Sequence, residues 1–435
     1  MRGSAVFRTG VAPGGALAPG WVKNELWRKA RTVPSLDLRF ADDKSLVDAV
    51  TGAQLVTFTR ASSGTYVDSA GVLRTAATDV PRFDHNPTTG ESLGLLVEEP
   101  RTNLLLRSEE FGTTWTPFRA SVSTDATTAP NGSTTADKIV EDTTAANSHG
   151  VQQTGISFVA STTYTFSVFL KPAERSNARI GIPGFVAQFN LQALSVTALT
   201  AGATGAIQMF ANGWFRCSVT ATVASTASGS VSVSMGETSA STTINYTGDG
   251  TSGLFLWGAQ LEAGAFPTSY IPTTTATATR SADVASITGT AFSSWYRQDE
   301  GTMFAQGSTS ASASNPILFQ VEDGTANERI QIRRIGATNL ASSIVSDGGV
   351  NQGGPSVAGF NADTIGKVGF SYALNNLQLA FNGALGTADT SATLPTVDRA
   401  FIGSASSPVY ANGHISRITY WPTRLSEVLQ RITQP

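Results

Sequence analysis

Apolar and polar residues alternate along most of this 435-residue chain, in short runs separated by glycine, asparagine or proline. The runs SLDLRF, LVTFTR, TYTFSVFLKP, WFRCSVTATV and ERIQIRRI are examples. With a repeat of two residues, successive side chains lie on opposite faces of the strand, which is typical of half-buried antiparallel strands. The pattern predicts an all-β fold with two antiparallel β-sandwiches.

Turn-rich breaks divide the chain into five predicted segments. We expect an N-terminal arm over residues 1–34, a small β connecting unit over 35–100, a first sandwich over 101–272, an extended linker over 273–286 and a second sandwich over 287–435. In the small unit, TYVDSAGVLRTA predicts a hairpin in which Gly71 takes a positive φ. At the C-terminus, Ser426 is the predicted N-cap of a short helix.

The segment WVKNELWRKAR, residues 21–31, is basic and amphipathic. Its Trp21, Leu26 and Trp27 share part of one helical face, with Arg28 and Arg31 beside them. Two interpretations stay open. The helix either covers a sandwich of its own chain or docks on another protein, because exposed tryptophans on an arm are costly without a partner.

Composition narrows the classes of partner. The 29 basic and 32 acidic residues leave a net charge of −3, which gives no electrostatic signature of nucleic-acid binding. No stretch approaches the ~20 apolar residues of a membrane span, and no signal-peptide pattern stands at the N-terminus, so we expect cytoplasmic assembly and no membrane insertion. The single Cys217 excludes an intrachain disulfide framework.

Several motifs together resemble a known family. The order TRAS, TYVD, VPRFD, GLLVEE and RTNLL between Phe58 and Leu106 resembles a module of tailed-phage virion fibre and spike proteins, both tail fibres and head fibres. The series NLLLRSEEF, YTFSVFLK, GWFRCS and LWGAQLE resembles their jelly-roll carbohydrate-binding modules. The ending YWPTRLSEVLQRIT resembles that of their concanavalin A-like or laminin G-like sandwiches.

This resemblance implies a non-enzymatic virion surface protein that attaches to bacterial surface polysaccharide. It also implies a homotrimer, docking to other virion proteins through the N-terminal arm, and release from the host cytoplasm by lysis. Two alternatives remain: a purely structural virion protein, such as a capsid decoration or tail-assembly component, and a polysaccharide-degrading tailspike enzyme.

The enzymatic alternative lacks a motif. Carboxylates such as Glu98-Glu99 and Glu322-Asp323 are adjacent pairs, and neighbours on a strand point to opposite faces. Such a pair cannot flank one glycosidic bond at the separation of about 5 to 9.5 Å that two-carboxylate mechanisms need. Two carboxylates from different strands could still meet.

Glycan binding would use aromatic faces with polar groups around them. The candidates are Trp115, Trp214 with Arg216, Tyr246, Trp295 and Tyr296, and Trp115 is expected to be the best exposed because threonines surround it. The alternative is that these rings belong to the sandwich cores.

Two further groups of polar residues have alternative interpretations. Asn245, Asp249 and Thr251 in the loop NYTGDGTSG offer hard oxygen ligands for a structural calcium ion, the one cofactor considered, although Asp-Gly is also ordinary turn chemistry. Between Phe58 and Leu106, charged residues form either a binding groove or structural clamps. They are Arg60, Asp68, Arg82, Asp84, Glu98, Glu99 and Arg101.

Overall fold

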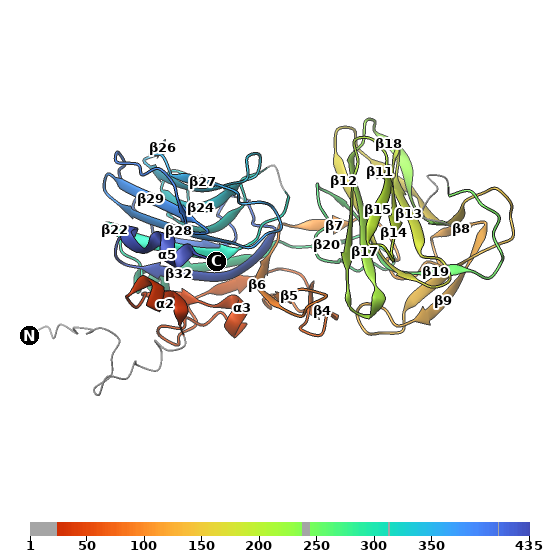
Figure 1. Ribbon diagram of the computed structural model, residues 1–435, viewed down its shortest axis with the longest axis horizontal. Helices are drawn as coiled ribbons and strands as arrows, with labels where there is room; N and C mark the ends of the chain where they lie inside the picture. The colour runs from red at the N-terminus through yellow and green to blue at the C-terminus, as the bar shows by residue number, and fades with distance from the viewer. Residues whose placement is uncertain (1–23, 237–243, 312–313, 408) are drawn as a thin grey trace, which may run out of the picture. The chain divides into compact units, whose positions relative to one another are not determined.

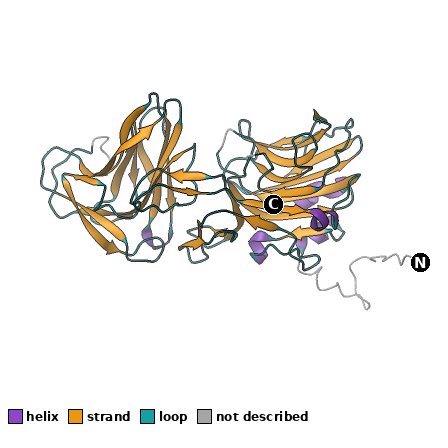
Figure 2. Ribbon diagram, turned by 180° about the vertical axis from the view of Figure 1, so that it is seen from behind, coloured by secondary structure: helices purple, strands orange, loops and turns teal. Residues whose placement is uncertain are grey.

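The computed structural model describes residues 24–236, 244–311, 314–407 and 409–435. Strands dominate these residues, and the helices are few and short (Figure 2). The chain forms two compact units. The middle unit comprises Arg60–Ser92 and Pro100–Ala282, and the C-terminal unit comprises the residues up to Thr59, Leu93–Glu99 and Asp283–Pro435. Each contains an antiparallel sandwich, which confirms the predicted all-β fold.

The middle unit is built on two six-stranded sheets (Figure 1). The first has the order β16 (Thr204–Met209), β17 (Phe215–Thr222), β12 (Thr163–Pro172), β19 (Gly253–Ala263), β10 (Ala136–Glu141), β9 (Ala120–Thr127). The second has the order β15 (Ser195–Leu199), β14 (Phe185–Asn190), β13 (Asn177–Ile182), β18 (Ala227–Gly236), β11 (His149–Phe158), β8 (Thr116–Phe118), and the turn η1 (Ala211–Gly213) precedes β17. Phe166, Val168, Cys217 and Val219 are fully buried between the sheets.

Short strands complete the middle unit. β3 (Gly64–Val67) and β4 (Leu73–Ala76) form the predicted hairpin, and Gly71 has φ 75°, as its turn requires. β5 (Phe83–His85) follows, and β7 (Arg101–Asn103) pairs with β20 (Ala278–Arg280). Arg60 and Arg82 are buried and donate to the carbonyls of Ser62 and Thr65 at 2.9 Å. These contacts support the structural interpretation of that charged group.

In the C-terminal unit, one sheet has the order β30 (Ala384–Leu385), β29 (Asn376–Phe381), β28 (Gly366–Ala373), β22 (Glu300–Gly307), β32 (Gly413–Trp421), and both β6 (Ser92–Val97) and β1 (Leu36–Leu38) pair with β32. The other has the order β2 (Thr57–Thr59), β21 (Val284–Thr288), β31 (Arg399–Ile402), β23 (Ile317–Glu322), β24 (Arg329–Ile335), β25 (Leu340–Asp347), β26 (Val350–Asn351), and β27 (Ser356–Ala358) also pairs with β25.

Helices in the C-terminal unit are α2 (Glu25–Ala30), α3 (Phe40–Asp43), α4 (Gly289–Ser293), η2 (Ser426–Val428) and α5 (Leu429–Thr433). Ser426 is not the N-cap: Leu425 holds that position, and the Ser426 hydroxyl accepts from Arg424 Nη1 at 2.8 Å. No helix among the described residues is long and apolar enough to span a bilayer.

The predicted connecting unit and linker are corrected by the strand pairing. Residues 35–100 do not form a separate small unit, because β1, β2 and β6 pair within the C-terminal sandwich and the hairpin belongs to the middle unit. The predicted linker over 273–286 contains β20 and the start of β21. Isolated short strands bury too little surface to be stable, so β1, β2 and β6 complete existing sheets instead.

The N-terminal helix also packs on its own chain. Leu26 and Trp27 of α2 are 7% and 8% exposed, and Leu26 joins an apolar cluster with Trp421 and Leu429. The interpretation of Leu26 and Trp27 as a docking surface is therefore wrong, because the sandwich already covers both side chains. Arg28 and Arg31 are exposed. Trp21 lies outside the described residues.

Candidate functional site

The tryptophans predicted to bind glycan are buried. Trp115, Trp214 and Trp295 are 4%, 0% and 3% exposed, so the expected exposure of Trp115 is wrong. Trp115 packs on Phe111 with ring centroids 4.8 Å apart, and its indole N–H donates to a backbone carbonyl at 3.2 Å. Trp214 likewise donates to a carbonyl, at 3.0 Å. Trp115 belongs to the core cluster between the sheets, and Trp214 to a second cluster that contains Val67 and Leu73 of the hairpin.

Arg216 and Tyr246 are held by the middle unit itself. The Arg216 guanidinium donates to Thr268 O at 2.8 Å and Ser167 Oγ at 3.0 Å. The Tyr246 hydroxyl donates to Glu141 Oε2 at 2.5 Å, and the hydrogen bond from Arg175 helps to hold the pKa of that carboxyl below its usual range, although burial opposes this. Neither residue lines the cavities described below.

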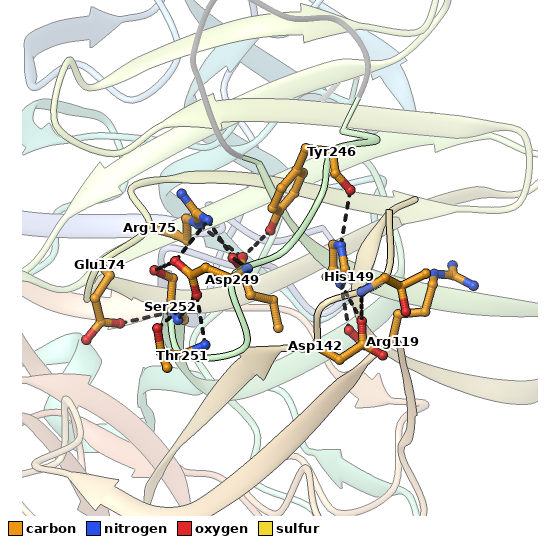
Figure 3. Close-up of polar contacts among 12 residues, drawn as sticks. Arg119, Asp142, His149, Glu174, Arg175, Tyr246, Asp249, Thr251 and Ser252 are labelled. Atoms are coloured by element: carbon orange, nitrogen blue, oxygen red, sulfur yellow. Dashed lines mark hydrogen bonds and ion pairs between the residues drawn. The ribbon is translucent and has the colours of Figure 1, made fainter. Parts of the chain in front are cut away.

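The loop proposed for calcium is closed by its own hydrogen bonds. Figure 3 shows Arg175, Tyr246 and Asp249 turned toward one another. Asp249 Oδ1 accepts from the backbone N–H groups of Thr251 and Ser252 at 2.8 and 2.7 Å, and Oδ2 accepts from the Ser252 hydroxyl at 2.6 Å. The hydrogen bonds from the side chain and the backbone of Ser252 lower the pKa of the Asp249 carboxyl. Asn245 is exposed and Thr251 also donates to Asp249. This geometry is that of a turn, and the described residues contain no group of three His, Cys, Asp or Glu side chains that could hold a metal ion.

The C-terminal unit contains a different polar surface, on the sheet that runs from β21 to β25. Inward-facing residues of this sheet, such as Phe319, Val321, Ile330 and Ile332, are fully buried in the core. Alternate residues point away from the core, and the strand register aligns them in rows. We call this outward set the polar face. Its first row across the strands is Thr288, Arg399, Glu322, Arg329 and Ser346, its second row is Ser286, Phe401, Gln320, Gln331 and Ile344, and its third row contains Arg333 and Ser342.

A chain of buried amides and a carboxylate crosses the centre of the polar face. The Gln331 amide donates to Gln320 Oε1, and the Gln320 amide donates to Glu322 Oε2. The backbone N–H of Ser406 reaches Glu322 Oε2 at 3.5 Å. Glu322 is fully buried, and within the described residues its Oε1 has no hydrogen-bond partner. The same holds for the Nε atoms of Arg329 and Arg333.

A cavity of about 420 Å³ lies at the end of the polar face, where β21 ends and β31 begins. Thr288 and Arg399 belong to both the cavity and the polar face, so the two are continuous. The lining residues are Thr288, Gly289, Phe292, Ser293, Tyr296, Gln298, Val397, Asp398 and Arg399. A second cavity of about 350 Å³ also uses Gln298, together with Thr393–Thr396.

Aromatic rings form one side of this cavity. Phe292 and Tyr420 both stack on the Tyr296 ring, with centroids 4.7 and 5.3 Å away. Trp295 supports them from the core, edge-on to Tyr420 at 5.0 Å. Burial raises the pKa of the Tyr296 hydroxyl, which stays neutral at physiological pH. Since two rings stack on it, Tyr296 contributes structure and apolar surface rather than a free face for stacking.

Polar groups on the other side are fixed in place. The Gln298 amide donates to Val397 O at 2.7 Å and accepts from Val397 N at 3.2 Å. Arg399 Nε donates to Asp398 Oδ1 at 2.7 Å, and this hydrogen bond raises the pKa of Arg399. The side chains of Asp398 and Arg399 remain 64% and 36% exposed. The cavity thus offers an exposed carboxylate and an exposed guanidinium beside aromatic residues.

The sequence pointed to only part of this surface. Of the predicted residues, Tyr296 lines the cavity and Trp295 packs behind it. Gln298, Asp398, Arg399 and the arginines of β24 were missed as site residues, although the alternation in ERIQIRRI already places Arg329, Gln331 and Arg333 on one side of a strand.

Comparison with family models and with curated proteins gives no match. Among solved structures, the CBM40 of the Ruminococcus gnavus IT-sialidase bound to α2,3 sialyllactose has 16% identity and a TM-score of 0.29, covering 32% of this chain and 84% of that one. The Streptococcus pneumoniae NanB sialidase has 17% identity and a TM-score of 0.28, covering 33% of this chain and 26% of that one. The Trypanosoma rangeli sialidase has 12% identity and a TM-score of 0.27, covering 34% and 26%. Similarities this low carry no information about function.

Proposed function

We propose that this protein binds glycan through the cavity and polar face of its C-terminal sandwich. The observation that carries the proposal is the cavity, which the aromatic residues Phe292 and Tyr296 line together with the exposed Asp398 and Arg399. A pyranose has apolar C–H faces and a rim of hydroxyls, and side chains of these two kinds recognise it. The exposed carboxylate accepts from sugar hydroxyls, and the guanidinium donates to them.

The biological setting in this proposal is the surface of a tailed-phage particle, where the chain acts as a non-enzymatic attachment protein for bacterial polysaccharide. Its support is the motif order between Phe58 and Leu106. A homotrimer, contacts with other virion proteins and release by lysis belong to the same proposal. Because Leu26 and Trp27 are covered by their own sandwich, the remaining docking candidates of the arm are Arg28, Arg31 and Trp21, which lies outside the described residues.

The direct test is a glycan array probed with the purified full chain and with the variant Arg399→Ala. Removing a charge-assisted hydrogen-bond donor should weaken binding by about tenfold or more. Arg74→Ala is the matched control, because Arg74 also forms an exposed ion pair, with Asp68 at 2.6 Å, on a strand of the middle unit. Equal binding by both variants, or no glycan bound by the parent chain, would rule out this site.

A second measurement distinguishes a glycan-binding protein from an enzyme that degrades the polysaccharide. The polysaccharide that the array identifies is incubated with the protein, and newly formed reducing ends are counted. We expect none above the blank. Release of reducing ends that disappears in Asp398→Asn or Glu322→Gln would identify the chain as a depolymerising enzyme instead.

A further inference from the structure

Two arginines on strand β24 have no acidic partner. Arg329 and Arg333 lie on the polar face, separated by Gln331, and four residues of strand span about 13 Å. Elsewhere in the described C-terminal unit, cations such as Arg297, Arg399 and Arg417 form ion pairs with carboxylates. No ion pair joins Arg329 or Arg333 to a described residue.

Their neighbours across the sheet explain this. Arg333 stands opposite Ile317 on β23 and Ser342 on β25, both uncharged. Arg329 stands opposite Glu322, but the Glu322 carboxylate turns toward Gln320, and no ion pair forms with Arg329. The two guanidinium groups therefore lie on the outer side of the sheet without an ion pair to a described carboxylate.

Both arginines are half-buried, and this arrangement is costly. The Nε atoms of Arg329 and Arg333 are out of contact with solvent and have no hydrogen-bond partner among the described residues. Burial, and then the positive charge of Arg329, lower the pKa of Arg333. An arginine nevertheless keeps its proton at any physiological pH, so the charge remains. A bound anion would offset the two positive charges and relieve the repulsion between them.

The geometry of the ligand group follows from the guanidinium. Its planar array of N–H donors matches a carboxylate, which accepts two parallel hydrogen bonds. Two such groups on one strand suit a chain molecule that presents carboxylates at intervals. Gln331 lies between them but is only 4% exposed, so the arginines carry the recognition.

We propose that Arg329 and Arg333 form an anion-binding strip that recognises an acidic polysaccharide, one whose sugar units carry carboxylates. The strip extends the glycan-binding proposal along the polar face from the cavity, through the row that joins Thr288, Arg399, Glu322 and Arg329. It rests on that proposed function and adds the charge class of the ligand.

The test measures binding of the full chain to polygalacturonate, to neutral dextran and to polyglutamate, a polyanion without sugar. We expect polygalacturonate to bind best and its affinity to fall as salt rises. Arg333→Gln should weaken it by about tenfold, and Arg333→Lys, which keeps the charge but loses the fork, by less. Arg74→Gln is the control, and circular dichroism and thermal melting verify that each variant is folded.

Each outcome decides between the two proposals. Tight binding of polyglutamate would show that charge alone is captured, which overturns the strip as a glycan site. The parent chain could instead bind dextran, or neutral glycans on the array, with no preference for polygalacturonate. If Arg333→Gln leaves that binding unchanged, the strip is overturned while the glycan-binding function stands. No binding of any glycan would overturn both.

Discussion

The buried carboxylate of Asp37 provides the sharpest test of how the N-terminal helix is held. Asp37 lies on β1 and is fully buried. Its two oxygens accept hydrogen bonds from the side chains of Asn24, Trp27, Arg39, Arg417 and Thr419, at 2.7 to 3.1 Å. The carboxylate therefore joins α2 to β1 and β32. The perturbation is Asp37→Asn, which keeps the shape but removes the charge and one acceptor.

The expected loss is large because the partners are also enclosed. The side chains of Arg417 and Arg39 are only 14% and 20% exposed, so both guanidinium groups would be left without their counter-charge. Removing one partner of a buried pair costs about 3–5 kcal/mol. The matched control is Asp299→Asn, because Asp299 pairs with Arg297 at 68% and 44% exposure. An exposed pair of this kind contributes little to stability, because solvent and salt screen it.

The assay is equilibrium unfolding in guanidinium chloride, followed by tryptophan fluorescence. Because the chain has two units, a second probe is needed for the middle unit, and labelling of the buried thiol of Cys217 supplies it. We expect Asp37→Asn to lower the midpoint of the C-terminal unit and to leave the Cys217 labelling curve in place. A loss no larger than that of Asp299→Asn would refute the reasoning.

The pH dependence of the same variant has a definite sign. Burial alone would raise the pKa of Asp37, but Arg417 and Arg39 outweigh it, and the folded-state pKa lies below its usual range. The folded state thus favours the ionised form, and its stabilising contribution is complete above the unfolded pKa of about 3.9. It disappears as the pH falls through the folded pKa. The difference between parent and variant should therefore be full at neutral pH and shrink in acid; a constant difference would contradict the mechanism.

Three further results are expected. Gly71→Ala should destabilise the middle unit by about 1–3 kcal/mol, because the added Cβ would lie 2.6 Å from Pro87 O. The control Gly52→Ala has the same φ of 75° but open space around it, and it should cost about 1 kcal/mol. Thermal melts measure both. The Cys217 thiol should resist alkylation until unfolding, since burial raises its pKa. The protein should melt at the same temperature in chelator and in added calcium, because the oxygens of Asp249 already accept hydrogen bonds within its turn. A rise in melting temperature with calcium would support the predicted calcium site instead.

Local patterns were sufficient to predict strands and turns but not their assembly. The alternation in SLDLRF and LVTFTR identifies strands correctly, and Gly71 takes the conformation that its turn requires. Nothing local says that β1 pairs with β32, nearly four hundred positions later, because that pairing depends on a free edge created by the rest of the sandwich. The predicted small unit was wrong for this reason.

The aromatic candidates show a second limit. A tryptophan between threonines, as at Trp115, has the same local pattern whether it is exposed or buried. The decisive fact is whether distant strands cover it, and here Trp115 belongs to the same core cluster as Val151 and Leu254. Ring size itself favours burial, since a large apolar side chain gains about 1.5–3 kcal/mol or more by leaving water. Aromatic residues are therefore poor indicators of binding in sandwiches of this kind.

The polar positions of a strand carry more information about function than its apolar ones. On β23 and β24 the apolar residues pack the core, as alternation requires, and any β-sandwich would have them. Gln320, Glu322 and Gln331 also lie on the outward side, yet they are 0–4% exposed, and alternation alone does not explain why a sheet should bury them there. Buried polar groups are costly unless they are satisfied. Finding such groups beside Arg329 and Arg333, with Nε and Oε1 atoms left without partners in the described structure, points to a surface shaped for a polar ligand.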